Sequence, residues 1–204
     1  MNVTLIDYGA GNLHSVANAL RALGVEPTIA TSPEDLGDTT HLVLPGVGSF
    51  GDCMAELEKR NLLQPIREWV TAGKPYLGIC LGYQILFESS EETPGVKGLG
   101  LLAGTVRRFK EVPGLKIPHM GWNSVVPTQP DTGRWLELGA EPYFYYVHSY
   151  FPVPDSDGIV AARTSYGDDT FAAAIELPNV LACQFHPEKS QKAGQQLIRN
   201  FLGI

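Results

Sequence analysis

Short apolar runs alternate with helical patterns along the first 87 residues. Four runs, each bounded by turn residues, predict strands at 3–6, 28–30, 41–44 and 75–79. Apolar residues at helical spacing predict helices over 13–23 and 53–70, the second broken near 61–65, and the start of a helix over 81–87. Asn12 is a candidate cap for the first helix, and Gly24 is a candidate stop. This alternation predicts a mostly parallel sheet with helices on both faces.

The second half of the chain has a different pattern. Residues 88–100 are polar and rich in glycine, which predicts a loop. Short strands separated by turn residues are expected at 105–108, 122–126, 143–149, 158–163 and 171–175. An apolar strand at 180–185 and a helix over 189–201 close the pattern. The expected fold is therefore α/β: a mostly parallel sheet flanked by helices, with an antiparallel extension in the second half, in a single domain over residues 1–204.

Composition narrows the functional classes. The 204 residues carry a formal net charge of −7, which argues against a nucleic-acid surface. No apolar run approaches the ~18 residues of a transmembrane helix. The N-terminus lacks the pattern of a signal peptide, and three cysteines are too few for a disulfide scaffold. We therefore expect a reduced, cytoplasmic protein without a membrane contact.

The sharpest chemical motif is Gly78-Ile79-Cys80-Leu81-Gly82. It places a cysteine between two glycines at a predicted strand-to-helix turn, the form of a nucleophile elbow. The bend would lift the Cys80 thiol to the carboxyl end of the sheet, and the N-terminus of the next helix would favour its thiolate. A cysteine merely buried in a glycine-rich turn is the alternative interpretation.

A second motif, His186-Pro187-Glu188, follows the last apolar strand. His186 would project at the same sheet edge as Cys80, where a neutral imidazole can accept the thiol proton. Glu188 can then hold the other ring nitrogen. An isolated His-x-Glu is usually an ordinary surface pair, but here it accompanies a cysteine elbow.

The turn Pro45-Gly46-Val47-Gly48 follows the third predicted strand and could offer a peptide N–H to a developing oxyanion. The N–H of Leu81 would be the second donor. Cys53 and Cys183 lack such partners and are expected to be packing residues. Metal-ligand spacing, a P-loop and a dinucleotide fingerprint are missing from the sequence, so neither a metal nor a cofactor is expected.

Together, Cys80 with its glycines and Gln84, the His186 motif and the turn at 45–48 resemble the class I (triad) glutamine amidotransferases over nearly the whole chain. The resemblance implies that Cys80 attacks the side-chain amide of glutamine, that His186 and Glu188 move the protons, and that the N–H groups near Val47 and of Leu81 bind the oxyanion. It also implies a set of residues that hold glutamine: Gly48, Gln84, Glu92, Ser149 and Tyr150.

Residues 7–12, 118–123 and 145–150 resemble the branch of this family that serves imidazole glycerol phosphate synthases in histidine biosynthesis. That resemblance implies a heterodimer in which ammonia passes to a separate cyclase subunit, a (β/α)8 barrel. We expect the docking face and the ammonia passage to involve five residues: Asn12, Met120, Trp122, Tyr145 and Lys189. For Met120 and Trp122, packing in the core is the competing interpretation.

Three alternative functions remain open at this point. The chain could supply ammonia to another synthase, such as those of anthranilate, aminodeoxychorismate or pyridoxal phosphate. It could be a non-catalytic module on the same scaffold, with Cys80 as a redox sensor, although Cys80, His186 and Glu188 are all retained. A cysteine peptidase or related hydrolase fits the His-Pro-Glu motif and Gln84 poorly.

Overall fold

The computed structural model describes residues 1–9 and 12–204. Residues 10 and 11, which belong to the 7–12 motif, lie outside the described residues. In the first half, the elements are β1 (Val3–Ile6), α1 (Leu13–Ala22), β2 (Thr28–Ala30), β3 (His41–Gly46), α2 (Phe50–Lys59), α3 (Leu63–Thr71), β4 (Tyr76–Cys80) and α4 (Leu81–Gln84). In the second half, they are β5 (Ser89–Ser90), β6 (Gly104–Arg108), β7 (His119–Ser124), β8 (Val126–Pro127), β9 (Tyr143–His148), β10 (Tyr150–Pro154), β11 (Val160–Tyr166), β12 (Asp169–Glu176), β13 (Val180–Cys183) and α5 (Gln191–Leu202).

The main sheet has eight strands in the order β2-β1-β3-β4-β13-β12-β11-β8. The pairs from β2 through β13 are parallel, and β12, β11 and β8 continue the sheet in antiparallel fashion. The predicted α/β class, with a mostly parallel sheet and an antiparallel extension, is confirmed. Because β3, β4 and β13 are adjacent and parallel, their carboxyl ends meet at one edge of the sheet.

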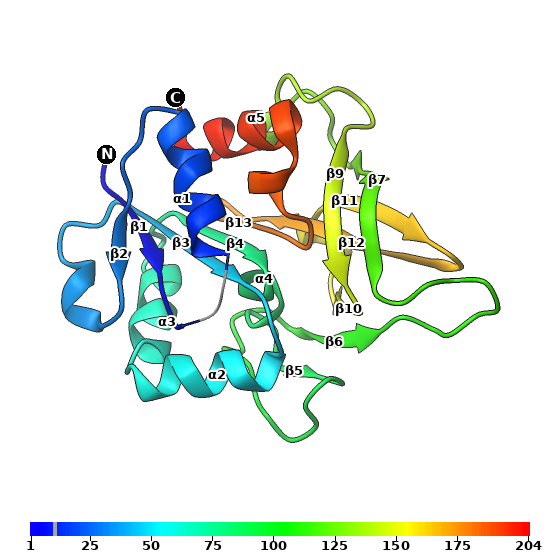
Figure 1. Cartoon of the computed structure of the whole chain (residues 1–204), viewed down its shortest axis with the longest axis horizontal. Helices are drawn as coiled ribbons and strands as arrows, with labels where there is room; N and C mark the ends of the chain where they lie inside the picture. The colour runs from blue at the N-terminus through cyan, green and yellow to red at the C-terminus, as the bar shows by residue number, and fades with distance from the viewer. Residues whose placement is uncertain (10–11) are drawn as a thin grey trace.

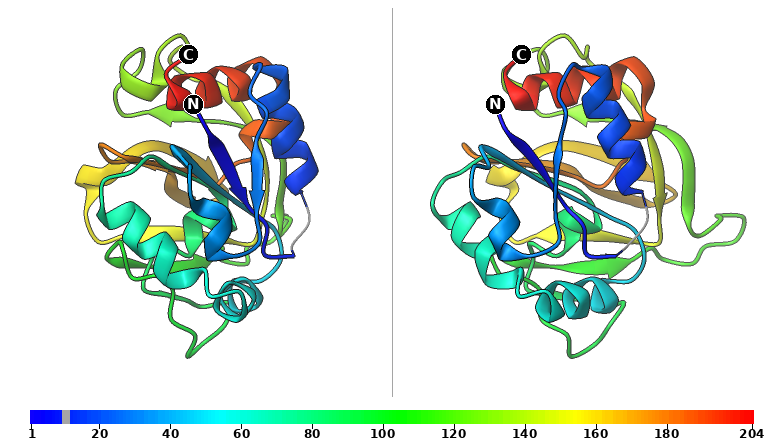
Figure 2. Two further views of the ribbon diagram at one scale, coloured as in Figure 1. Left: turned by 90° about the vertical axis from the view of Figure 1, so that its left-hand side faces the viewer. Right: turned by 60° about the vertical axis from the view of Figure 1, so that its left-hand side comes forward.

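Helices cover both faces of this sheet, as Figures 1 and 2 show. On one face, α1 and α5 bury Val16, Leu20 and Leu197 against the strands. On the other face, α2 and α3 bury Phe50 and Ile66. Strands that are covered by apolar layers on both faces have nearly continuous hydrophobic sequences, and for this reason the sequence pattern predicted them well. No helix among the described residues is long and apolar enough to cross a membrane.

The second half does more than extend the main sheet. β7 and β9 form a separate antiparallel ribbon, and β10, β6 and β5 form a third sheet. β7 and β9 stand beside the end of the main sheet (Figure 1). The strand β10 was not predicted, because Pro152 and Pro154 interrupt its pattern and prolines are typical of edge or irregular strands.

Three helix predictions need correction. The break in 53–70 lies at residues 60–62, where Asn61 takes a left-handed φ of 57°, and Pro65 fits within the first turn of α3. The helix expected over 81–87 is only the four residues of α4. The last helix begins at Gln191, so Lys189 lies before it, in a 3-10 turn over Pro187–Lys189.

Candidate active site

Cys80 is the last residue of β4 and sits on a strained turn. Its φ is 54° and its ψ is −102°, a conformation that residues with a Cβ rarely adopt. The flanking glycines are sterically required: a Cβ on Gly78 would lie 2.5 Å from the Gly82 carbonyl oxygen, and one on Gly82 would lie 1.9 Å from that of Leu44. The backbone around Cys80 therefore has the geometry of the predicted nucleophile elbow. The helix after it is a single turn, so its dipole supports a thiolate less than the sequence analysis expected.

Substituting Gly82 by alanine is expected to destabilise the fold by about 3 kcal/mol or more, because the new methyl group meets a backbone carbonyl that cannot move freely. Chemical denaturation of the variant measures this loss. Gly37→Ala is the matched control: Gly37 has an ordinary φ of −46°, and no described atom lies within 4 Å of the new Cβ. The explanation fails if the two variants unfold at the same denaturant concentration.

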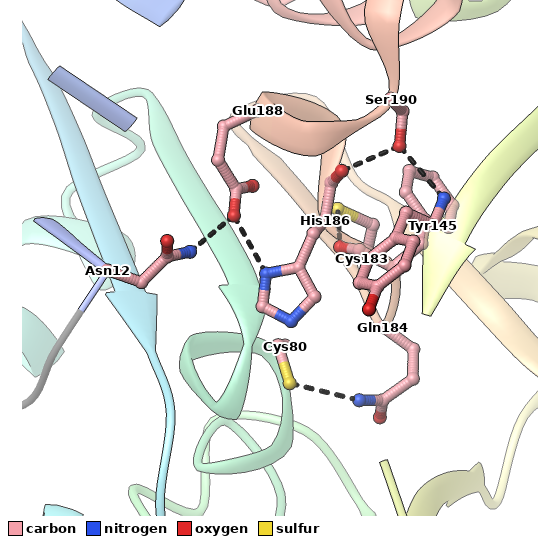
Figure 3. A network of polar contacts seen from close by, with 9 residues as sticks. Asn12, Cys80, Tyr145, Cys183, Gln184, His186, Glu188 and Ser190 are labelled. Atoms are coloured by element: carbon pink, nitrogen blue, oxygen red, sulfur yellow. Dashed lines mark hydrogen bonds and ion pairs between the residues drawn. The ribbon is translucent and has the colours of Figure 1, made fainter. Parts of the chain in front are cut away.

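His186 and Glu188 lie beside Cys80. His186 Nδ1 is 2.8 Å from Glu188 Oε1, and both side chains are fully buried. The side-chain amide of Asn12 donates to the same carboxylate oxygen. The other ring nitrogen, Nε2, faces Cys80 and has no hydrogen-bond partner among the described residues (Figure 3). Asn12 occupies the capping position of α1 as predicted. Its side chain, however, donates a hydrogen bond to Glu188 and makes no capping bond to the helix.

The main chain ties this segment to the β7–β9 ribbon. Tyr145 in β9 accepts the His186 N–H through its carbonyl at 2.8 Å. The Ser190 hydroxyl donates to the His186 carbonyl at 2.6 Å and accepts the Tyr145 N–H at 2.9 Å (Figure 3). The position of His186 is therefore coupled to the position of β9.

The electrostatics favour a charged imidazole. Burial by itself lowers the pKa of His186, but the negative charges of Cys80 and Glu188 outweigh burial and raise the pKa to about 10. Transfer of the thiol proton to a neutral imidazole, as expected from the sequence, would leave an imidazolium beside a thiolate. The surroundings favour this charged imidazolium, which is ready to donate a proton.

The other two thiols, those of Cys53 and Cys183, are also buried, but neither is paired with His186. Burial raises the pKa of Cys53 to about 12, and burial also raises the pKa of Cys183, with help from the charges of Glu188 and Cys80. Both therefore stay protonated, as expected of packing residues. Among the described residues, no three His, Cys, Asp or Glu side chains are grouped so that they could hold a metal ion.

A cavity of about 300 Å³ opens in front of Cys80. It is lined by every residue that the resemblance implied for glutamine or the oxyanion: Val47, Gly48, Leu81, Gln84, Glu92, Ser149 and Tyr150. Gly46 packs too closely for a side chain, since its Cβ would lie 2.6 Å from that of Leu81. The turn at 45–48 therefore sits directly against the elbow.

Two cavity residues are partly engaged by the protein itself. Glu92 Oε2 accepts the N–H of Phe50 at 2.7 Å, which fixes the carboxylate at the start of α2. The side-chain amide nitrogen of Gln84 donates to the Tyr150 carbonyl at 3.1 Å and to Gln184 Oε1 at 3.0 Å. Among the described residues, both bonds of Gln84 use its nitrogen, which leaves the amide oxygen for a ligand.

Sequence reasoning missed four residues of this site. Pro118, Val147 and His148 line the cavity, and Gln184 Nε2 donates to Cys80 Sγ at 3.4 Å. Gln184 could have been found, because it lies two residues before His186 and so shares its side of an extended segment. Val147 and His148 lie in the 145–150 motif, but their place at the cavity depends on how β9 packs.

The five residues expected at a docking face fall into two groups. Met120 and Trp122 are 62% and 47% exposed, so the core-packing interpretation is wrong for both. Trp122 contacts Tyr145 edge to face, with ring centroids 6.3 Å apart, and the Lys189 ammonium lies 5.8 Å from the Tyr145 ring centroid. Asn12 instead is half-buried against Glu188.

Comparison with known proteins agrees with this geometry. The model of the family "Glutamine amidotransferase class-I" matches residues 4–203. The chain is 47% identical over 98% of its length to imidazole glycerol phosphate synthase subunit HisH of Synechococcus elongatus, covering 92% of that protein. It is 47% identical over 99% of its length to the protein of the same name in Thermosynechococcus vestitus, covering 96% of it.

Solved structures share the fold at lower identity. A glutamine amidotransferase superposes with a TM-score of 0.77 at 22% identity, with 99% of this chain and 98% of that chain covered. The structure of PurLQS from Thermotoga maritima gives 0.75 at 24% identity, with 99% and 97% covered. With an elbow cysteine, a buried His–Glu pair and a family match over almost every residue, the chain belongs to the class-I glutamine amidotransferases.

Proposed function

We propose that this chain is the glutaminase subunit of an imidazole glycerol phosphate synthase. The observation that carries the proposal is the 47% identity over nearly the full length of proteins with that subunit name, in a chain that keeps Cys80, His186 and Glu188 together beside a cavity. The chain hydrolyses glutamine to glutamate and ammonia. It passes the ammonia to a cyclase subunit, which makes imidazole glycerol phosphate and an aminoimidazole carboxamide nucleotide.

The proposed chemistry begins at the Cys80 sulfur. The thiolate attacks the side-chain carbonyl carbon of glutamine, and the N–H groups of Leu81 and of the Val47 region bind the oxyanion. His186, held by Glu188 through Nδ1, delivers a proton to the leaving ammonia from Nε2. Water then adds to the glutamyl thioester, His186 takes its proton, and glutamate leaves with the thiolate restored.

The cavity offers groups that suit the rest of glutamine. Glu92 presents a carboxylate for the α-ammonium group, and its contact with Phe50 keeps it in place. Gln84 keeps its amide oxygen free for a donor, while Gly48, Ser149 and Tyr150 complete the wall. A cavity of about 300 Å³ is at the small end for ligand sites, which suits a single amino acid.

The partner surface is proposed on the β7–β9 ribbon. Cross-strand pairing puts Trp122 opposite Tyr145 and Met120 opposite Val147. Val147 also lines the cavity, so this face runs to the place where ammonia is released. Exposed aromatic and Met side chains are typical of protein interfaces. With Asn12 and Lys189, this ribbon forms the docking face and the ammonia passage of a cytoplasmic heterodimer, in which residues 1–204 act as one domain.

Titrating the chain with the cyclase subunit and its nucleotide tests this function. Glutaminase activity is expected to rise by about 10²–10³-fold, the effect of one oxyanion donor, because docking would turn the glycine-rich 45–48 peptide toward the substrate. Trp122→Ala is expected to weaken binding by about 30-fold, the scale of an interface hot spot.

The matched control is Ile29→Ala, which removes a side chain of similar exposure from β2 at the far edge of the main sheet. It should leave the titration unchanged. A lone chain that is fully active and indifferent to the cyclase would refute the proposed partner, and equal weakening by both variants would refute the docking face.

A further inference from the structure

A buried chain of hydrogen bonds, separate from the His186–Glu188 pair, leads to the Cys80 sulfur. Gln184 is fully buried, and its Nε2 donates to Cys80 Sγ at 3.4 Å (Figure 3). Its Oε1 accepts from Gln84 Nε2 at 3.0 Å. We propose that Gln184 is a further catalytic residue, whose side-chain amide stabilises the thiolate of Cys80. The inference rests on the proposed function only in that Cys80 is the nucleophile.

The direction of the Gln184 amide follows from a group that can only accept. The Tyr150 carbonyl lies 3.1 Å from the side-chain amide of Gln84, so the nitrogen of that amide must face Tyr150. The same nitrogen lies 3.0 Å from the Gln184 side chain, which must therefore present its oxygen there. Only the Gln184 nitrogen is then left for the sulfur.

A second chain of bonds holds the Tyr150 carbonyl. His148 Nδ1 lies 2.8 Å from this carbonyl and must donate to it. His148 Nε2 then accepts from His119 Nδ1 at 3.0 Å, and His119 Nε2 accepts from the Asn123 amide at 3.2 Å. When both imidazole rings are neutral, the Nδ1 of each histidine donates and the Nε2 of each accepts, so all of these hydrogen bonds can form together. Burial supports the neutral forms, because it lowers the pKa of His119 to about 4 and that of His148 to about 3.

Two buried donors therefore flank the nucleophile. His186 faces the sulfur with Nε2 and gives up its proton to ammonia during the reaction, whereas the Gln184 amide keeps its protons throughout. When the carbon–sulfur bond forms, the sulfur loses its charge and this hydrogen bond weakens. When the thioester is hydrolysed, the electron pair returns to the sulfur and the bond strengthens again. Gln184 thus favours both the ready thiolate and its departure from the glutamyl group.

The test is the pH profile of Cys80 alkylation by iodoacetamide in the full chain. Gln184→Met keeps the length of the side chain but has no N–H to donate. The midpoint of the profile should move upward by about one pH unit or more, since a hydrogen bond to a charged group is worth about 10- to 100-fold in equilibrium. The titratable groups around the sulfur are unchanged in this variant, namely His186, Tyr8, Cys183, Glu92, His148 and Tyr150. A Cys80→Ala chain gives the background from Cys53 and Cys183.

Gln184→Glu is the second variant, and it decides the question if the methionine variant does not fold. A carboxylate still accepts from Gln84 but offers the sulfur no amide proton, so its midpoint should move upward further. The control is Gln196→Glu, the same change at a hydrogen-bonded glutamine on α5. In the complex with the cyclase, glutaminase kcat should fall about tenfold in Gln184→Glu with little change in KM.

An unchanged midpoint in a folded Gln184 variant would overturn the proposal, and so would an equal shift in Gln196→Glu. Alkylation needs neither glutamine nor the cyclase. A failure of the proposed synthase function would therefore leave this result intact and can be told apart from it.

Discussion

Replacing Cys80 by alanine is expected to abolish glutamine-dependent synthesis by the complex while synthesis from added ammonium continues. The variant would lose the proposed nucleophile of the thioester step, and removing the nucleophile of a catalytic triad costs on the order of 10⁶ in kcat. The cyclase reaction uses ammonia without Cys80 and should proceed at its normal rate. Measuring product formation from glutamine and from ammonium chloride side by side tests both the expected loss and the expected retention of synthesis.

Cys183→Ala is the matched control, because it removes another buried thiol that does not line the cavity. It should retain glutamine-dependent synthesis. If Cys80→Ala lost activity equally with both nitrogen sources, Cys80 would be needed for more than amide cleavage, and its assigned role would be wrong.

The second large effect is expected from Glu188→Gln. Glu188 accepts from both His186 Nδ1 and Asn12 through Oε1, and an amide oxygen at this position could still accept from both, but the amide would carry no negative charge beside the imidazolium. The carboxylate also helps to raise the pKa of His186, and this pKa should therefore fall in the variant. An imidazole that is less readily protonated, with no carboxylate to stabilise its charged form, is expected to lower glutaminase kcat by about 10³–10⁴-fold, the scale of loss when a catalytic triad loses its carboxylate.

Glu176→Gln provides the comparison for this loss. Glu176 pairs with Arg134 at 3.0 Å, and neither residue lines the cavity at Cys80. This variant should keep its kcat and show at most a small loss of stability. Nearly wild-type turnover in Glu188→Gln would mean that His186 is oriented by other contacts.

The parallel half of the fold and the grouping of Cys80, His186 and Glu188 could be predicted because their signals are local. The apolar runs at β3, β4 and β13 each end at the same sheet edge, and the glycines around Cys80 mark the only kind of residue that fits the elbow. His186 follows the last of these strands. The proximity of His186 to Cys80 therefore follows from the order of the strands in the sheet.

The rest depends on packing between distant segments, which no local pattern encodes. The β7–β9 ribbon was expected as part of one sheet, and only its register shows that Met120 and Trp122 point to solvent. The two-residue spacing places Gln184 on the same side as His186, but it does not say which way the Gln184 amide points. Its bond to Cys80 exists because Gln84 and Tyr150, 100 and 34 residues away, turn its amide.

Ammonia released at Cys80 is expected to reach the cyclase without entering solvent, and this transfer can be followed with an isotope label. The complex is supplied with glutamine that carries 15N in its side-chain amide, in the presence of unlabelled ammonium. The 15N content of the imidazole glycerol phosphate is then measured by mass spectrometry. Direct transfer should give one 15N atom in nearly every product molecule, and the label should be lost when Cys80 is alanine. Product that contains the unlabelled nitrogen in proportion to the ammonium present would contradict it.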